Sequence, residues 1–223
     1  MVHRRARYAV APLLIGLFAL LGAAPSAVHS SLSVLPADGE TVKLRLTGDR
    51  QTIDGDSSFN TELTLVRTGH DLAVTSAPAN GSPLGGDARI LDDGSLLIAP
   101  GDLAVQLDAV NLASAVASAA PVPLSLVSTW NASVPVATDT NVTVPISVIV
   151  SDPAPAHTAL SAQGRGSVPI EGHAGPVLGN VSVQYTLNFK NGAFAGAAGV
   201  IFADAGPTSK THTVTNWHLA PQN

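Results

Sequence analysis

The chain has 223 residues, a net charge of −5 with neutral histidines, no cysteine and a hydrophobic share of 45%. This hydrophobic share argues against disorder, and without cysteine the fold must rest on core burial and hydrogen bonds instead of disulfides. The basic residues after position 30 are scattered from Lys43 to Lys210 among 16 acidic residues, so we expect no nucleic-acid partner.

The start of the chain has the layout of a removable signal peptide. Arg4, Arg5 and Arg7 precede an uncharged run at 9–24 that is dominated by Leu, Ala, Ile and Phe. The run is shorter than the ~20 residues with which a helix spans a bilayer, which disfavours the alternative of a permanent anchor. We therefore expect removal of residues 1–30 by cleavage between about residues 26 and 31, leaving an acidic, secreted or periplasmic protein without a stable membrane span.

The first strands are predicted from alternating side chains. Residues 41–47 alternate Val and Leu with Lys, Arg and Thr, which is typical of a half-buried strand. Residues 59–65 alternate in the same way, and the Thr-Gly-His-Asp segment at 68–71 can turn the chain into a partner strand at 72–75. This part of the chain is therefore predicted to form a hairpin.

A second hairpin is predicted after a loop. Residues 76–87 are rich in Pro, Gly, Asn and Ser, which are typical loop residues. Short apolar segments at 89–91 and 96–98 then flank a turn that contains Asp93 and Gly94. Both of these residues tolerate the positive φ that a tight turn requires, so the two segments are expected to pair.

One helix is predicted at about 102–120, where the sequence is rich in alanine and free of Gly and Pro. Asp102 can accept hydrogen bonds from the first free backbone amides, and Pro121 begins a segment that stops the helix. An alternative remains for the first two turns, because Leu103 and Leu107 also fit a strand pattern of period two.

The middle of the chain returns to strand character at 124–130 and 141–151. Pro145 lacks an amide hydrogen, which favours an edge position or a bulge. The Pro-rich segment at 152–158 is either a stiff loop or a weak domain boundary. Because the part beyond it is small for a unit without disulfides, we prefer a single domain over 31–223.

The clearest local pattern lies near the C-terminal end. Alternating residues at 181–190 are followed by Asn191 and Gly192, the preferred pair for a type I′ hairpin turn. A two-residue loop fixes the register of the hairpin. The predicted partners are Lys190 with Ala193, Phe189 with Phe194, Leu187 with Gly196, Tyr185 with Ala198, Val183 with Val200 and Val181 with Phe202. A last strand is expected at about 210–219.

The predicted fold is therefore mainly β: an antiparallel sandwich or a strongly curved sheet, with one α-helix at about 102–120 packed on a face or across an open end. Asp54, Asp56, Asn60 and Glu62 could supply oxygen ligands to calcium, but their spacing is not that of an EF-hand, and a solvated turn is the preferred interpretation. No other motif is typical of a catalytic, metal or cofactor site, so we expect none of these and favour a non-enzymatic protein.

Two hypotheses for function follow. The first is an exported, non-enzymatic β-domain that acts in protein interaction or in envelope or extracellular structure. The alternative is an extracytoplasmic carrier that holds an apolar small molecule or lipid between the C-terminal hairpin and the helix, a general plan shared by carriers of lipid across the bacterial envelope. Its predicted ligand-facing residues are Tyr185, Leu187, Phe194, Gly196, Ala198 and Phe202. An empty cavity of several hundred Å³, in place of a filled core, would favour the carrier.

Overall fold

The computed structural model describes residues 32–98, 102–136, 139–154, 156–172, 175–204 and 212–222, so the predicted signal peptide lies outside the described residues. Within these ranges the chain forms eleven strands and one helix. In chain order they are β1 (Thr41–Thr52), β2 (Gly55–Thr68), β3 (Asp71–Pro78), β4 (Leu84–Ile90), β5 (Leu96–Ile98), α1 (Asp102–Ser118), β6 (Thr129–Val136), β7 (Asp139–Ala154), β8 (His157–Gly172), β9 (Gly175–Lys190), β10 (Ala193–Asp204) and β11 (His212–Pro221).

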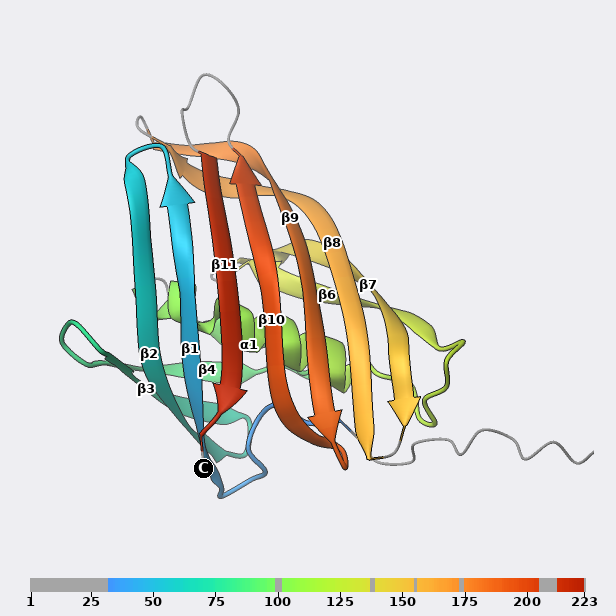
Figure 1. Cartoon of the computed structure of the whole chain (residues 1–223). Helices are drawn as coiled ribbons and strands as arrows, with labels where there is room; N and C mark the ends of the chain where they lie inside the picture. Colours follow the sequence, from blue (N-terminus) through green and yellow to red (C-terminus); the bar gives the residue numbers. More distant parts are fainter. Residues whose placement is uncertain are drawn as a thin grey trace, which may run out of the picture.

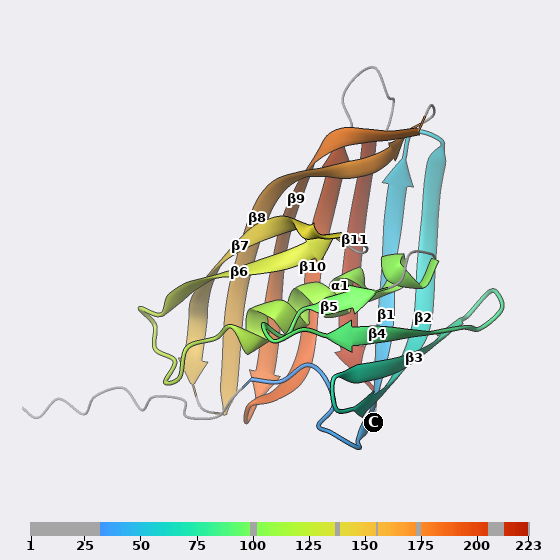
Figure 2. The same ribbon diagram turned by 180° about the vertical axis from the view of Figure 1, so that it is seen from behind.

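The strands form one antiparallel sheet that is not closed, in the order β5-β4-β3-β2-β1-β11-β10-β9-β8-β7-β6 (Figure 1). Strands β1 to β5 and strands β6 to β11 are two up-and-down meanders, which are joined where β1 pairs with β11. The sheet curves around α1, with β6 and β7 on one side of the helix and β4 and β5 on the other (Figure 2). The predicted mainly-β fold with one helix is confirmed, in its curved-sheet form.

The helix occupies the concave side of the sheet and is buried on nearly all sides. Every residue from Ala109 to Ala117 is buried, which fits the alanine-rich sequence because small side chains let the surrounding strands approach closely. A helix that is apolar around most of its circumference is stable only when it is enclosed. The predicted helix is confirmed, and the alternative of a strand at Leu103 and Leu107 is wrong.

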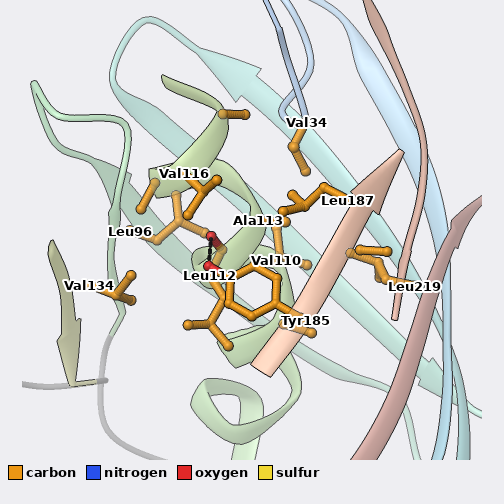
Figure 3. Packing of buried hydrophobic residues seen from close by; sticks show 14 of the residues in the cluster. Val34, Leu96, Val110, Leu112, Ala113, Val116, Val134, Tyr185, Leu187 and Leu219 are labelled. Atoms are coloured by element: carbon orange, nitrogen blue, oxygen red, sulfur yellow. Dashed lines mark hydrogen bonds between the residues drawn. The ribbon is translucent and has the colours of Figure 1, made fainter. Parts of the chain in front are cut away.

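Tyr185 of β9 connects the sheet to the helix in the centre of the core. It is 2% exposed, and its hydroxyl donates a hydrogen bond of 3.1 Å to the carbonyl of Leu112 (Figure 3). Its ring lies 5.8 Å from that of Trp217. Burial raises the pKa of the Tyr185 hydroxyl, so this group stays protonated and acts as a donor. Leu187 and Leu219 are buried in the same cluster.

Glycines in β8 allow the sheet to bend sharply beside β7. The pairing of these two strands begins at Ile146 and Gly164, and the earlier part of β7 crosses over β8. A Cβ on Gly164 would lie 2.5 Å from the carbonyl oxygen of Pro145, and one on Gly166 would lie 3.3 Å from Val144. Pro145 precedes the first residue of β7 that pairs with β8, so its missing amide hydrogen costs no hydrogen bond to β8.

The register predicted for the C-terminal hairpin is correct only at its turn. Asn191 and Gly192 have φ values of 52° and 83°, and Phe189 pairs with Phe194 as expected. A β-bulge follows, in which Gly196 has a φ of 152° and pairs with Asn188. One extra residue shifts every later pair and exchanges the two faces of the strand.

The shifted pairs therefore correct the predicted ones. Tyr185 lies opposite Gly199 instead of Ala198, Leu187 opposite Ala197, Val183 opposite Ile201 and Val181 opposite Ala203. Tyr185 therefore packs closely against the backbone of Gly199. Phe202, expected to face Val181, is 42% exposed.

Several predicted boundaries also differ from the structure. The loop predicted at 76–87 is shorter, because β3 continues to Pro78 and β4 begins at Leu84. The strand predicted at 124–130 begins later, at Thr129, and β8 was not predicted as a strand. The segment at 152–158, predicted as a stiff loop or a weak domain boundary, instead contributes the paired ends of β7 and β8, where Pro153 pairs with Thr158 and Ala154 with His157.

Candidate functional site

A cavity of about 1130 Å³ lies between the concave face of the sheet and α1. Residues from β1, β2 and β6 to β11 line it, together with residues 78–80 at the end of β3 and five residues of the helix between Gln106 and Leu112. It adjoins the core around Tyr185 without including that residue. The sequence alone left open whether the space beside the helix is filled, and the structure shows that part of it is not.

One wall of the cavity is aliphatic. Five consecutive strands of the sheet, β6 to β10, each contribute small branched or methyl side chains to it. These residues, the aliphatic wall, are Val134, Val144, Val168, Val181, Val183, Ile201 and Ala203. Such a surface offers dispersion contacts and no hydrogen bonds, so it suits a hydrocarbon group.

The adjoining part of the sheet, which begins where β11 pairs with β10, carries many hydroxyl and amide groups. This polar wall, from β1, β2 and β11, consists of Thr47, Arg50, Thr52, Ser57, Ser58, Thr61, Thr213 and Thr215. Asn60 also borders the cavity, but its side-chain oxygen accepts a hydrogen bond from the exposed Arg45. Leu46, Phe59 and Trp217 lie among these residues. From the helix, Gln106, Asp108 and Asn111 add further polar groups, while Ala109 and Leu112 add apolar surface. The cavity is therefore apolar on one side and mixed on the other.

Arg50 and Asp108 are the ionisable side chains among the described residues that line the cavity. Burial raises the pKa of the Asp108 carboxyl from 3.8 to about 7, and the positive charge of Arg50 opposes this shift only in part. Asp108 retains some accessible surface because its carboxyl faces the cavity. Within the part of the chain that the structure describes, it forms neither an ion pair nor a hydrogen bond.

Arg50 is held by one contact. Its Nε donates a hydrogen bond of 3.4 Å to Oγ1 of Thr215 on the neighbouring strand β11. Its terminal amino groups have no partner among the described residues. The indole Nε1 of Trp217, another lining residue, is buried and also lacks a partner within the described ranges. The cavity thus has several hydrogen-bonding groups that the protein leaves unused.

None of the six residues predicted to face a ligand lines this cavity. Tyr185 and Leu187 are buried in the core, and Phe194 packs edge-on against Phe189 at 6.0 Å. Gly196 forms the bulge, while Ala198 and Phe202 are exposed. The structure does not bring these six side chains together, and ligand contact by any of them stays a separate prediction.

A signal for the cavity was present in the helix sequence. Gln106, Asp108 and Asn111 are polar residues in the middle of an alanine-rich helix that strands enclose. Gln106 accepts a hydrogen bond from Ser76 and Asn111 accepts one from Leu96, so Asp108 is the residue that carries the signal. Polar groups in such surroundings need partners or a cavity. The polar wall gave no signal, because threonine and serine are ordinary residues of strands.

The residues weighed as calcium ligands, for which a solvated turn is the preferred interpretation, are not gathered into one metal site among the described residues. Asn60 accepts a hydrogen bond of 3.2 Å from Arg45, and Glu62 forms an ion pair of 3.2 Å with Lys43. Within the described ranges, no three His, Asp or Glu side chains are close enough together to hold a metal ion. Among the same residues, no helix has the length and apolar character needed to cross a membrane.

Comparisons with known proteins identify no family. No family model and no curated protein matches the chain. One solved structure that is similar is a crystal structure from Bacteroides fragilis, described as an exported protein with a YmcC-like fold. The match has 13% sequence identity and a TM-score of 0.23, and it covers 84% of this chain and 97% of the other.

Proposed function

We propose that the protein is an extracytoplasmic carrier that binds an apolar or amphiphilic small molecule between its curved sheet and α1. The observation that carries this proposal is the cavity of about 1130 Å³ with its aliphatic wall. Ligand pockets typically have volumes of about 300–1000 Å³ and are lined mainly by apolar groups. The location outside the cytoplasm follows from the predicted signal peptide.

The size of the cavity argues for an occupant. Protein interiors pack to crystal-like density, and voids larger than a water molecule are few. The space opens to solvent where exposed residues such as Ser57 and Ser58 line it, so a small molecule can enter it from outside. The hypothesis of a protein-interaction or structural role rests on surface composition and does not account for the cavity.

Mass spectrometry of the protein purified without detergent tests the proposal directly. Under native conditions we expect a small-molecule adduct of defined mass, which is released when the protein is denatured. A neutral apolar fluorophore, N-phenyl-1-naphthylamine, then measures whether the cavity is the binding site.

Two tryptophan variants on β10 make the fluorophore experiment specific. Ala203 lies in the aliphatic wall, whereas Ala198 is on the opposite, exposed face of the same strand. We expect Ala203→Trp to weaken fluorophore binding at least about tenfold by filling the cavity, and Ala198→Trp to leave it within about twofold. Equal effects of the two variants, or no binding to the unmodified protein and a clean apoprotein mass, would contradict the proposal.

A further inference from the structure

The geometry points to a more specific ligand class: an amphiphile with an anionic head group, held by Arg50 beside Asp108, with its apolar chain along the aliphatic wall. This inference rests on the proposed function, because it assigns the two ends of a ligand to the two walls of the same cavity. Arg50 is on β1, and the aliphatic wall begins two strands away on β10, where Ile201 pairs with the same Thr215 that lies opposite Arg50, so a ligand could reach both features along one sheet face.

Arg50 supplies the fixed charge of the cavity. Guanidinium groups keep their proton at all ordinary pH values, and they match carboxylate and phosphate groups through two parallel hydrogen bonds. Thr215 accepts only from Nε of Arg50, which leaves the terminal amino groups available within the part of the chain that is described. A head group that carries negative charge would give this guanidinium the partner that the protein does not provide.

Asp108 favours an anionic head group over a cationic one because its carboxyl can be neutral near pH 7. A cationic head would need Asp108 ionised in a buried position and would be repelled by Arg50. A protonated Asp108 can instead donate its O–H to an anionic head group. The raised pKa of about 7 makes the protonated form accessible near neutral pH.

No further ionisable group interferes among the described residues around the cavity. The strands packed on α1 are β4, β5, β6 and β11, and none of them presents another ionisable side chain to this space. Binding of an anion beside Asp108 would raise the pKa of its carboxyl further. Binding therefore takes up a proton above about pH 7, and affinity for the anion falls as the pH rises.

Competition against N-phenyl-1-naphthylamine with ligands of equal chain length tests the head group. Oleate carries a carboxylate, oleyl phosphate carries a phosphate, and oleyl alcohol has the same chain without charge. The variants are Arg50→Gln and, as a matched control, Arg45→Gln, whose side chain is exposed on the same strand.

We expect Arg50→Gln to weaken oleate or oleyl phosphate binding on the order of 10-fold to 100-fold and oleyl alcohol binding by less than about threefold. The tighter of the two anions then identifies the head chemistry. Arg45→Gln should change none of the three. The inference is overturned if Arg50→Gln weakens anion and alcohol alike, or weakens neither. If the head-group inference fails but oleyl alcohol still binds tightly, the proposed carrier function remains supported. If no ligand displaces the fluorophore, the result counts against the carrier function and the head-group inference alike.

The role of Asp108 has its own readout. Between pH 7 and 9 we expect oleate affinity of the unmodified protein to fall at least about tenfold. Asp108→Asn keeps a neutral hydrogen-bond donor and removes the titration, so its affinity should stay flat over the same range. A flat profile in the unmodified protein, or the same decline in both proteins, would overturn the assignment of Asp108.

Discussion

Asn111 of α1 accepts a hydrogen bond of 2.7 Å from the backbone amide of Leu96 on β5, the strand at one edge of the sheet. At the other edge, Trp130 of β6 donates its indole Nε1 to the carbonyl of Val116 at 3.2 Å. The helix therefore satisfies polar groups of both edge strands, which do not pair with each other. This arrangement holds the curved sheet around the cavity.

The first prediction concerns the contact at β5. Asn111→Ala should lower the free energy of unfolding by about 1–3 kcal/mol, because it leaves the buried amide of Leu96 without a partner. Asn131→Ala, at an exposed position of β6, is the control and should cost less than about 0.5 kcal/mol. Urea unfolding measures both, and a similar cost for the two variants would contradict the assigned role of Asn111.

The second prediction concerns the corrected register of the C-terminal hairpin. A Cβ on Gly199 would collide with Cβ of Tyr185 and lie 2.7 Å from the carbonyl oxygen of Gln184. Gly199→Ala should therefore destabilise the protein by about 1–3 kcal/mol. Gly85→Ala is the control, because nothing lies within 4 Å of its Cβ position. If the unfolding midpoint of Gly199→Ala equals that of the control, Gly199 does not lie opposite Tyr185.

The third prediction is a pH dependence of stability. The pKa of Asp108 is raised from 3.8 to about 7 in the folded protein, so the folded state binds this proton more tightly than the unfolded state. Stability then falls as the pH rises through this interval and stays lower above it. Asp108→Asn should raise the free energy of unfolding by about 2 kcal/mol at pH 8 and by almost nothing at pH 4. The full pKa shift would imply an upper limit of about 4 kcal/mol. Thermal unfolding of both proteins at the two pH values decides the matter, and an equal difference at both would refute it.

The fourth prediction separates the core from the cavity. Tyr185→Phe removes the hydrogen bond to Leu112 and should cost about 1 kcal/mol of unfolding free energy. Because Tyr185 does not line the cavity, fluorophore affinity should stay within about twofold. A loss of affinity much greater than the loss of stability would instead support the sequence-based prediction that Tyr185 faces a ligand.

Elements that are specified by a few neighbouring residues could be predicted from the sequence. Alternating residues in β1, β2 and β9, the Asn191-Gly192 turn and the alanine-rich helix were all recognisable from a few neighbouring residues. The bulge at Gly196 was not, because a glycine in a strand is compatible with regular pairing as well as with a bulge. Strand β8 was missed because Gly164 and Gly166 interrupt its alternation, and those glycines are needed for the bend beside β7.

The cavity required information of a different kind. Val134, Val181 and Ile201 belong to three strands, and only the curvature of the whole sheet places them on one wall. Arg50 and Asp108 are 58 positions apart and belong to no motif. The spacing of residues within single strands does not determine where a sheet bends, so the sequence left both a filled core and a cavity open.

The order of the strands also shapes how the chain can assemble. Every pair of neighbours in the sheet is consecutive along the chain except β1 with β11. Each meander can therefore form from hairpins between consecutive strands, which require only short loops to close. Among the strand pairs, β1 with β11 is the one that joins segments far apart in the sequence. A break at 119–128, between α1 and β6, would sever no strand pair. The molecule is thus suited to fragment complementation, with β1 and β11 as the complementary edges.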